Sequence, residues 1–220
     1  MTVLETISVL DLPDQRVAVC GDWHGDFDWL RTVRSAVQVA APDVTTILQL
    51  GDWWMDRDAC DAVFAGSGIE WVYVTLGNHE PWPEITPLLD AHPGQAIRVS
   101  EVTWLLPRPA RLRIGGRDIL SLGGAASVDR EWRVPGVSWW PDEVITEQQV
   151  ADAIAGGPAD VMITHESPAR TPVMAVNQIL QSNPLRFPTS TLLESAASRM
   201  RVAQAWDAVQ PRHLLHGDMP

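Results

Sequence analysis

The chain has 220 residues, of which 45% are hydrophobic and 20% charged, values typical of a globular protein that buries a full core. Its net charge is -12, so it gains no counterion-release attraction to a nucleic-acid backbone, and non-specific nucleic-acid binding is disfavoured. All sixteen cationic side chains are Arg, and the absence of Lys excludes both a Walker-type phosphate loop and a Schiff-base lysine enzyme.

The N-terminal stretch and the cysteines indicate the compartment. Residues 1–12 carry Glu5 and Asp11 without a basic cluster, which excludes an export signal, and no apolar run approaches the ~20 residues of a membrane span. Cys20 and Cys60 are too few for a disulfide framework. We therefore expect residues 1–220 to form a single domain of a reduced, cytoplasmic protein that does not bind membranes.

The first half of the chain predicts alternating strands and helices after a lead-in over residues 1–15. Apolar runs ended by Gly predict buried strands, and apolar residues at helical spacing predict helices. The expected elements are a strand at 16–20, a helix at 27–41, a strand at 44–50, a helix at 58–65 and a strand at 70–76. This order with short joints implies parallel strands.

Short extended pieces fill residues 97–122, at 97–99, 103–106, 111–114 and 119–122. Gly115-Gly116 between the last two is a hairpin signal. We expect these pieces to form a second, partly antiparallel sheet packed on the first. The irregular stretch 123–143 follows, and loops of this length in compact domains are usually functional.

The last third of the chain predicts helices and two further strands. Thr146 with Gln149 forms a plausible capping box for a helix at 147–155, and Thr191 with Glu194 suggests another cap. The apolar face of that last helix is predicted to be Leu192, Ala196, Met200, Ala203, Trp206 and Val209. Strands are expected at 160–164 and 213–216, with a loop and one short helix at 168–189.

Three Gly-led polar clusters each follow a predicted strand. They are Gly21-Asp22-Trp23-His24-Gly25, Gly51-Asp52-Trp53-Trp54 and Gly77-Asn78-His79-Glu80. The carboxyl ends of parallel strands meet at one sheet edge, where open α/β sheets place their ligands. Carboxylate, imidazole and amide-oxygen donors suit Mn, Fe, Zn or Ni better than Ca. A single Gly-Asp pair is more often only a turn, but three ordered clusters favour a metal site.

The spacing suggests a role for each donor. Asp22 and His24 could face one ion, and Asp52 could bridge two ions with its two oxygens. Asn78 and His165 could bind the second ion. Two metals ~3.5–4 Å apart would generate a hydroxide at neutral pH and clamp an in-line displacement at phosphorus. His79 beside them is the candidate proton donor.

These residues resemble the calcineurin-like metallophosphoesterases from about residue 16 onward. Asp22 and His24 match the family's Gly-Asp-X-His motif, Asp52 its Gly-Asp motif, and Asn78 with His79 its Gly-Asn-His motif. Thr164-His165-Glu166-Ser167-Pro168 is similar to its later metal-binding histidine segment. The resemblance implies an α/β fold with two mixed β-sheets flanked by helices, a four-layer αββα sandwich.

The resemblance also implies the ligand sets. Asp22, His24 and Asp52 would hold one divalent ion at the strand carboxyl ends. Asp52, Asn78 and His165 would hold a second ion, with His79 as proton donor. Mn is the favoured metal, with Fe, Zn, Ni or Mg as alternatives.

Candidate substrate residues are implied by further likenesses. The loop with Asp129, Arg130, Trp139 and Trp140 is similar to one in some bacterial and phage members, and a Trp-lined lid over the substrate is our hypothesis. Arg57 resembles the Arg that follows the second motif in protein Ser/Thr phosphatases, with one extra residue between. It is a weaker candidate for a phosphate clamp.

The chain departs from the family at its last motif, Gly-His-X-His. Gly217-Asp218-Met219-Pro220 stands there instead, with Asp218 at the first histidine and Pro220 at the second. Asp218 could still ligate a divalent ion, whereas Pro220 could not. Family members usually continue with further strands, so truncation at the C-terminus is a further expectation.

The leading hypothesis is a phosphomonoesterase or phosphodiesterase in which a metal-bound hydroxide attacks phosphorus and His79 acts as general acid. The alternative is a binding module with an impaired metal site and little activity. A metal hydrolase acting on a non-phosphate bond is a third interpretation. The expected partner is a phosphorylated small molecule, a nucleotide or a phosphoprotein.

Overall fold

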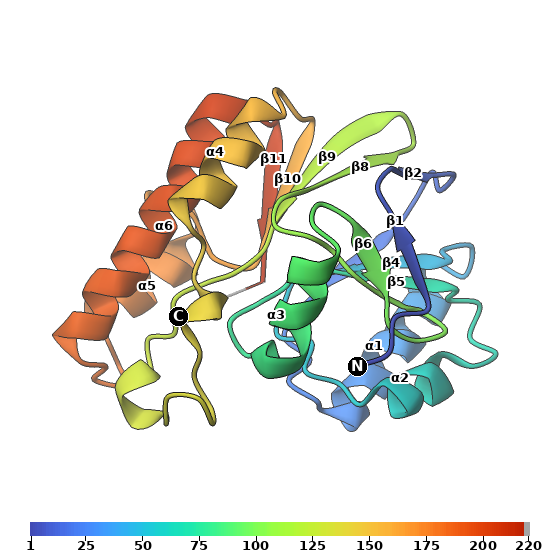
Figure 1. Cartoon of the computed structure of the whole chain (residues 1–220), viewed down its shortest axis with the longest axis horizontal. Helices are drawn as coiled ribbons and strands as arrows, with labels where there is room; N and C mark the ends of the chain where they lie inside the picture. Colours follow the sequence, from blue (N-terminus) through green and yellow to red (C-terminus); the bar gives the residue numbers. More distant parts are fainter. Residues whose placement is uncertain (218–220) are drawn as a thin grey trace.

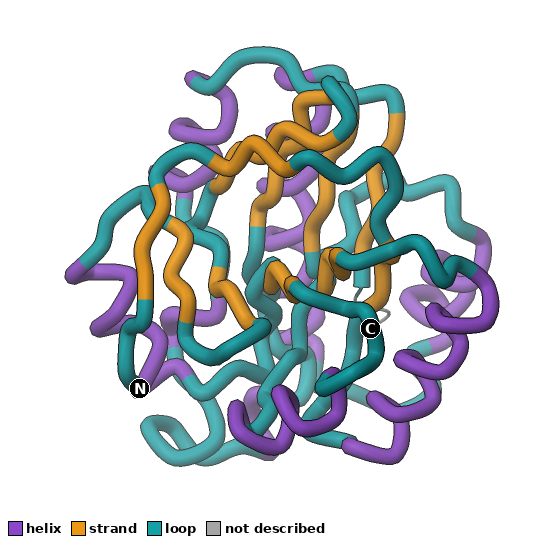
Figure 2. The backbone as a smooth tube through the Cα atoms, turned by 90° about the vertical axis from the view of Figure 1, so that its right-hand side faces the viewer, coloured by secondary structure: helices purple, strands orange, loops and turns teal. Residues whose placement is uncertain are grey.

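Two β-sheets lie face to face, and helices cover the outer face of each (Figure 1, Figure 2). The computed structural model describes residues 1–217. In spatial order the first sheet consists of β1 (Glu5–Ile7), β6 (Ala96–Arg98), β7 (Thr103–Leu105), β5 (Trp71–Val74), β4 (Thr46–Gln49) and β3 (Ala18–Cys20). The second consists of β11 (His213–His216), β10 (Val161–Thr164), β9 (Arg117–Leu122), β8 (Ala110–Ile114) and β2 (Leu10–Leu12).

The helices divide between the two outer faces. The first sheet is covered by α1 (Phe27–Ala40), α2 (Arg57–Phe64) and α3 (Trp82–Ala91). The second is covered by α4 (Glu147–Ala155) and α6 (Thr189–Val209), with α5 (Met174–Ser182) beside α6. Both sheets are mixed, because each contains parallel and antiparallel pairs. The αββα sandwich expected from the sequence is confirmed.

Three apolar layers hold the four structural layers together. Strand β4 shows why, since all its residues are buried and alternate side chains point to opposite faces. Ile47 packs with the helices of the first sheet and Leu48 packs between the two sheets. Each such fully buried side chain stabilises the fold by about 1.5–3 kcal/mol. Leu120, Met162 and Val202 belong to the third layer, beneath α4 and α6.

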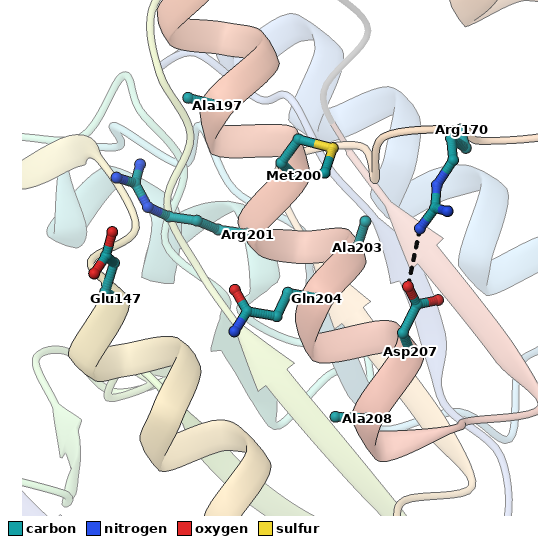
Figure 3. Close-up of a pocket in the computed structure, with 9 residues that line it drawn as sticks. All are labelled: Glu147, Arg170, Ala197, Met200, Arg201, Ala203, Gln204, Asp207 and Ala208. Carbon is teal, nitrogen blue, oxygen red and sulfur yellow. Dashed lines mark hydrogen bonds and ion pairs between the residues drawn. The ribbon is translucent and has the colours of Figure 1, made fainter.

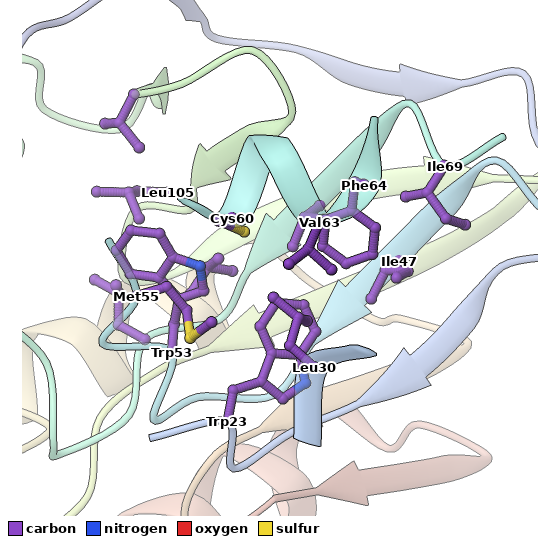
Figure 4. Close-up of a cluster of buried hydrophobic side chains, with 14 of the residues drawn as sticks. Trp23, Leu30, Ile47, Trp53, Met55, Cys60, Val63, Phe64, Ile69 and Leu105 are labelled. Atoms are coloured by element: carbon purple, nitrogen blue, oxygen red, sulfur yellow. The ribbon is translucent and has the colours of Figure 1, made fainter. Parts of the chain in front are cut away.

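The core beneath the first sheet contains large aromatic side chains from the polar clusters themselves. Trp23 and Trp53 are fully buried there beside Leu30 and Phe64 (Figure 4). Asp26 caps the N-terminus of α1 by accepting hydrogen bonds from the backbone of the first turn. Buried anchors on either side of Asp22, His24 and Asp52 therefore fix where those polar residues emerge.

Local signals predicted several elements well. α4 begins at the capping box of Thr146 and Gln149 and spans the predicted residues. β11 also has its predicted bounds. Gly115 and Gly116, with φ of 57° and 75°, join β8 to β9 in an antiparallel hairpin. β3, β4 and β5 are parallel as expected.

Two predictions about the strands are wrong. The N-terminal residues 1–15 are not a lead-in, because β1 and β2 join the first and second sheets. The pieces at 97–106 do not enter the second sheet, because β6 and β7 pair within the first. Such short segments carry no local mark of the sheet that they join, because the choice rests on contacts between residues distant in the chain.

The predicted start of α6 is wrong as well, and its predicted apolar face is only partly right, since Ala203 and Val209 are buried. Its N-cap is Pro188, and Thr191 lies inside the helix, where its hydroxyl donates to the Pro188 carbonyl. Met200 is 55% exposed, and Ala196 is exposed too. Small polar side chains, Ser195 and Ser198, lie on the buried face instead. Among residues 1–217, no helix has both the length and the apolar composition to cross a bilayer.

Candidate metal centre

Polar side chains from both sheets meet at one end of the sandwich. Asp22 and His24 follow β3, Asp52 follows β4, and Asn78 with His79 follows β5. These three strands are parallel neighbours, so their carboxyl ends share one edge. His165 follows β10 of the second sheet and joins the same group, within 3.3 Å of Asp52. The structure thus brings together every predicted metal donor within residues 1–217.

Backbone hydrogen bonds tie the three loops of the first sheet together. The Asp22 amide donates to the Gly51 carbonyl at 3.0 Å, and the His24 amide donates to the Asp52 carbonyl at 2.7 Å. The His79 amide donates to Oδ1 of Asp52 at 2.8 Å. The loop after β4 therefore determines the placement of the loops on either side of it.

Three of the donors adopt left-handed backbone conformations. The φ angles of Asp22, His24 and Asp52 are 56°, 46° and 54°. A non-glycine residue there costs about 1–2 kcal/mol, and such strain clusters at functional sites, where the surrounding structure enforces it. These conformations occur in the loops after two adjacent strands, β3 and β4, where the three side chains converge.

The first donor set is compact. One ligand atom each from Asp22, His24 and Asp52 lies within 4.8 Å of the others, which suits a shared cation. Nε2 of His24 lies 3.4 Å from Oδ2 of Asp52. Asp22 and His24 are partly exposed while Asp52 is buried, so the set opens to solvent on one side.

The second donor set uses the other oxygen of Asp52. Nε2 of His165 lies 3.3 Å from Oδ1 of Asp52 and 2.9 Å from Oδ1 of Asn78. Nδ1 of His165 lies 2.7 Å from the Leu50 carbonyl, which can only accept, so Nδ1 carries a proton. In the neutral imidazole, Nε2 then presents a lone pair to two oxygen acceptors. A cation between the three atoms satisfies them all, so this donor set fits a metal ion.

Glycines make the close approach feasible. A Cβ at Gly51, whose φ is 100°, would overlap the His165 ring and lie 2.8 Å from Cα of Gly77. A Cβ at Gly77 would overlap the amide and carboxylate of Asp52. Only glycine leaves room for the donors to converge at these two positions.

Electrostatics favour an ionised Asp52. Burial by itself raises the pKa of its carboxyl, but His165 and His79 in their protonated forms outweigh burial and hold the pKa far below its ordinary value. Burial lowers the pKa of His79, against the opposing effect of Asp52. A lower pKa makes the His79 imidazolium a stronger acid. Its ring lies edge-on to His24, with 5.3 Å between the ring centroids.

Sequence reasoning missed the residues that position the donors. The Glu80 carboxylate accepts hydrogen bonds from the amides of Gly77, Trp53 and Trp54 at 2.9–3.1 Å and so joins the second and third clusters. Burial first, and then Asp52, raises the pKa of Glu80 to about 7. Its position inside the third cluster was the only signal in the sequence.

Ser127 and Glu143 were missed as well. The Asn78 amide donates to Oγ of Ser127 at 2.9 Å, which turns Oδ1 of Asn78 toward His165. The Ser127 amide donates to the buried Glu143 carboxylate at 2.9 Å. Both residues lie in the irregular stretch 123–143, and its length was the only signal for them.

A cavity of about 410 Å³ opens over the donors. Besides Asp22, His24, Asp52, Asn78 and His79, it is lined by Ala126, Val128, Asp129, Leu185, Phe187 and Gly217. A larger hollow of about 780 Å³ lies along α6, with the ion pair of Arg170 and Asp207 at its edge (Figure 3). None of the metal donors lines that hollow, so the chemistry belongs to the smaller cavity.

The predicted substrate residues are dispersed. Asp129 lines the cavity at the donors, and Trp140 lines a neighbouring cavity that also reaches His79. Arg130 instead pairs with Glu194 at 2.6 Å, and the Trp139 indole donates to Glu143 at 2.9 Å.

Arg57 also lies away from the donors. Its guanidinium donates to the Val99 carbonyl at 3.3 Å, and Arg57 does not line the 410 Å³ cavity. Asp218, the remaining predicted metal ligand, lies outside the described residues. Its role stays a prediction.

Comparisons with known proteins place this centre in a family. A comparison with curated proteins returns no match. The model of the family described as calcineurin-like phosphoesterase matches residues 15–186, well over half of the chain. The matched segment contains the strand ends that supply Asp22, His24, Asp52, Asn78 and His165. The chain therefore belongs to the calcineurin-like phosphoesterase family.

Proposed function

We propose that this protein hydrolyses a phosphomonoester or phosphodiester at two cation sites that share Asp52, with His79 as general acid. The family supports a metal-dependent phosphoesterase in general. The observation that carries the proposal is the Asp52 carboxylate, one oxygen of which faces His24 while the other faces His165. A carboxylate placed in this way suits a bridge between two cations.

The donor set determines which metals fit. Asp22, His24 and Asp52 would hold one cation, and Asp52, Asn78 and His165 the other. Mixed carboxylate, amide and imidazole donors suit Mn, with Fe, Zn, Ni or Mg as alternatives. When bound, such cations supply an acidified water and positive charge beside the phosphoryl oxygens.

His79 is placed to move the proton. No described residue hydrogen-bonds to either ring nitrogen of His79, and the ring lines the cavity at the donors. In hydrolysis a water oxygen bonds to phosphorus while the bond to the leaving oxygen breaks. The His79 imidazolium gives its proton to that oxygen, and the attacking water loses one proton to solvent. The products are an alcohol and phosphate, or an alcohol and a phosphomonoester where the substrate is a diester. Asp129 lines the same cavity.

The test combines metal content with turnover. We expect two Mn per chain by elemental analysis, and hydrolysis of a chromogenic phosphomonoester or phosphodiester under added Mn. His79→Ala should lower kcat by about 10²–10⁴-fold without reducing metal content. His92→Ala, a change at the end of α3 away from the centre, is the matched control and should change neither quantity.

Two results would oppose the proposal. Hydrolysis unaffected by His79→Ala would remove His79 from the reaction. If the wild type binds one metal or none and shows no turnover, and Asp218→His gains turnover, the result would support the metal-impaired binding module instead. The substrate classes named in the sequence analysis stay predictions, and so does the cytoplasmic location. Cys20 and Cys60 form no disulfide in the structure.

A further inference from the structure

His79 lies at the boundary between two cavities. One is the 410 Å³ cavity over the metal donors, and the other has a volume of about 170 Å³. The smaller cavity is also lined by Trp54, Trp140 and Arg133. Among the lining residues described for the two cavities, His79 is the one that they share. A group that accepts a proton from His79 therefore has space on the side away from the donors.

Trp54 occupies a strained position in this smaller cavity. Its φ is 33°, which is a genuine outlier for a bulky side chain, and its side chain is nevertheless 54% exposed. The Trp54 amide donates to Glu80 at 3.1 Å, while its carbonyl lies 2.9 Å from where a Cβ on Gly25 would be. The hydrogen bond to Glu80 of the third cluster thus fixes the backbone of Trp54, and the lack of a side chain at Gly25 of the first cluster leaves room for the Trp54 carbonyl. Packing of the Trp54 ring itself does not explain the strain, because the ring remains exposed.

Trp140 supplies a second aromatic wall. It is half-buried and packs against the core beneath the first sheet. The neighbouring Trp139 is held by its hydrogen bond to Glu143, which anchors this part of the loop. The two indoles that line the cavity are therefore supported from different segments, after β4 and before α4. Both present flat apolar surface beside His79.

The charges around the smaller cavity disfavour a second anionic group. Arg133 is its lining cation, and its guanidinium already donates to Ser127 at 2.7 Å and lies 3.7 Å from the carboxylates of Asp129 and Glu143. Glu84, also at the rim, pairs with the N-terminal ammonium of Met1 at 3.7 Å and is 55% exposed. The volume equals that of about five or six waters, enough for one planar ring.

We propose that Trp54 and Trp140 bind the leaving group of the substrate, and that this leaving group is an uncharged alcohol carrying a planar ring. The inference rests on the proposed function, since the phosphoryl group then sits at the donors. Its leaving oxygen meets His79, and the ring attached to that oxygen enters the 170 Å³ cavity. An extended polyphosphate is disfavoured there, because Arg133, the cation among the residues that line this cavity, is already paired with the carboxylates of Asp129 and Glu143.

The test compares benzyl phosphate with methyl phosphate, which leave as alkoxides of similar basicity. Release of phosphate is measured under added Mn. Trp54→Ala and Trp140→Ala should each lower kcat/KM for benzyl phosphate about tenfold, and should change methyl phosphate less than about twofold. Trp54→Phe and Trp140→Phe keep a flat ring and should retain most of the preference. Trp29→Ala, a change of an indole on α1 that is 47% exposed, is the matched control and should alter neither rate.

Circular dichroism checks that each variant is folded. If an Ala variant is unfolded, the Phe variant at the same position tests the proposal in its place. An equal fall for both substrates, or no fall for either, overturns the proposal. If Leu185→Ala or Phe187→Ala instead removes the preference for benzyl phosphate, the leaving group belongs in the 410 Å³ cavity. That result also overturns the proposal. If the wild type hydrolyses neither of these substrates nor the chromogenic phosphomonoester and phosphodiester, the proposed function fails; in either case calorimetric binding of benzylphosphonate then decides the subsite alone. Binding weakened by Trp54→Ala but not by Trp29→Ala supports it, and no binding refutes it.

Discussion

Oδ1 of Asp52 lies 3.3 Å from Nε2 of His165, although Asp52 follows a strand of the first sheet and His165 a strand of the second. This contact crosses the interface between the sheets, so the second donor set exists only when the two sheets are packed. Asp52 belongs to both donor sets, whereas Asp22 belongs to one. The two aspartates should therefore differ in what their loss removes.

Asp52→Asn should abolish binding of both cations, whereas Asp22→Asn should weaken the first site and leave the second. The bridging carboxylate contributes charge to both sites, and the Asp22 carboxylate contributes to one. Isothermal titration with Mn measures the stoichiometry, with Asp28→Asn on the exposed face of α1 as the control. Equal stoichiometry in the Asp22 and Asp52 variants would argue against a bridge.

Ser127→Ala should weaken the second cation site about 10–100-fold while leaving the fold intact, since it removes a partner that orients a ligand. The Ser127 hydroxyl accepts from the Asn78 amide at 2.9 Å and keeps Oδ1 of Asn78 directed at His165. Mn affinity from the titration checks this, and Ser35→Ala on α1 provides the comparison. An unchanged affinity in Ser127→Ala would mean that the orientation of Asn78 does not depend on Ser127.

Gly51→Ala should destabilise the protein by more than about 3 kcal/mol, and Gly66→Ala by only about 1 kcal/mol. Both glycines have positive φ, 100° and 66°, so both variants strain the backbone. Only the Cβ at Gly51 meets other atoms, those of His165 and Gly77, whereas nothing lies within 4 Å at Gly66. Urea unfolding measures both variants, and similar losses would show that strain alone matters.

The buried Glu143 should make stability fall as pH rises toward neutrality. Burial raises the pKa of its carboxyl from 4.5 to about 7, against the opposing hydrogen bonds from Ser127. The folded state therefore holds this proton more tightly than the unfolded state. The stabilising contribution is complete below about pH 4.5 and is lost as pH rises through about 7.

Glu143→Gln should remove that dependence. Relative to this variant, the wild type should lose up to about 3 kcal/mol of unfolding free energy between pH 4.5 and 8. Urea unfolding across that range gives the difference, and Glu70→Gln, a change at an exposed residue, should reproduce the wild-type curve. Parallel curves for the wild type and Glu143→Gln would show that Glu143 does not titrate in this range.

The sequence by itself determined the chemical identity of the donors and the local turns that present them. Asp22, His24, Asp52 and Asn78 follow strands within one parallel unit, and local patterns of apolar runs and glycines specify such units. The capping box of α4 and the glycine hairpin of β8 and β9 are local in the same sense. Each depends on hydrogen bonds between residues close in the chain.

Only the tertiary structure decided the partners that lie far apart in the chain. The residues of the short strands β1, β2, β6 and β7 do not indicate which of the two sheets each strand joins. The exposed, strained Trp54 and its cavity beside His79 appeared only once Glu80 and Gly25 were placed around it. Burial and charge depend on every neighbour in space, and a sequence pattern reports only the neighbours along the chain.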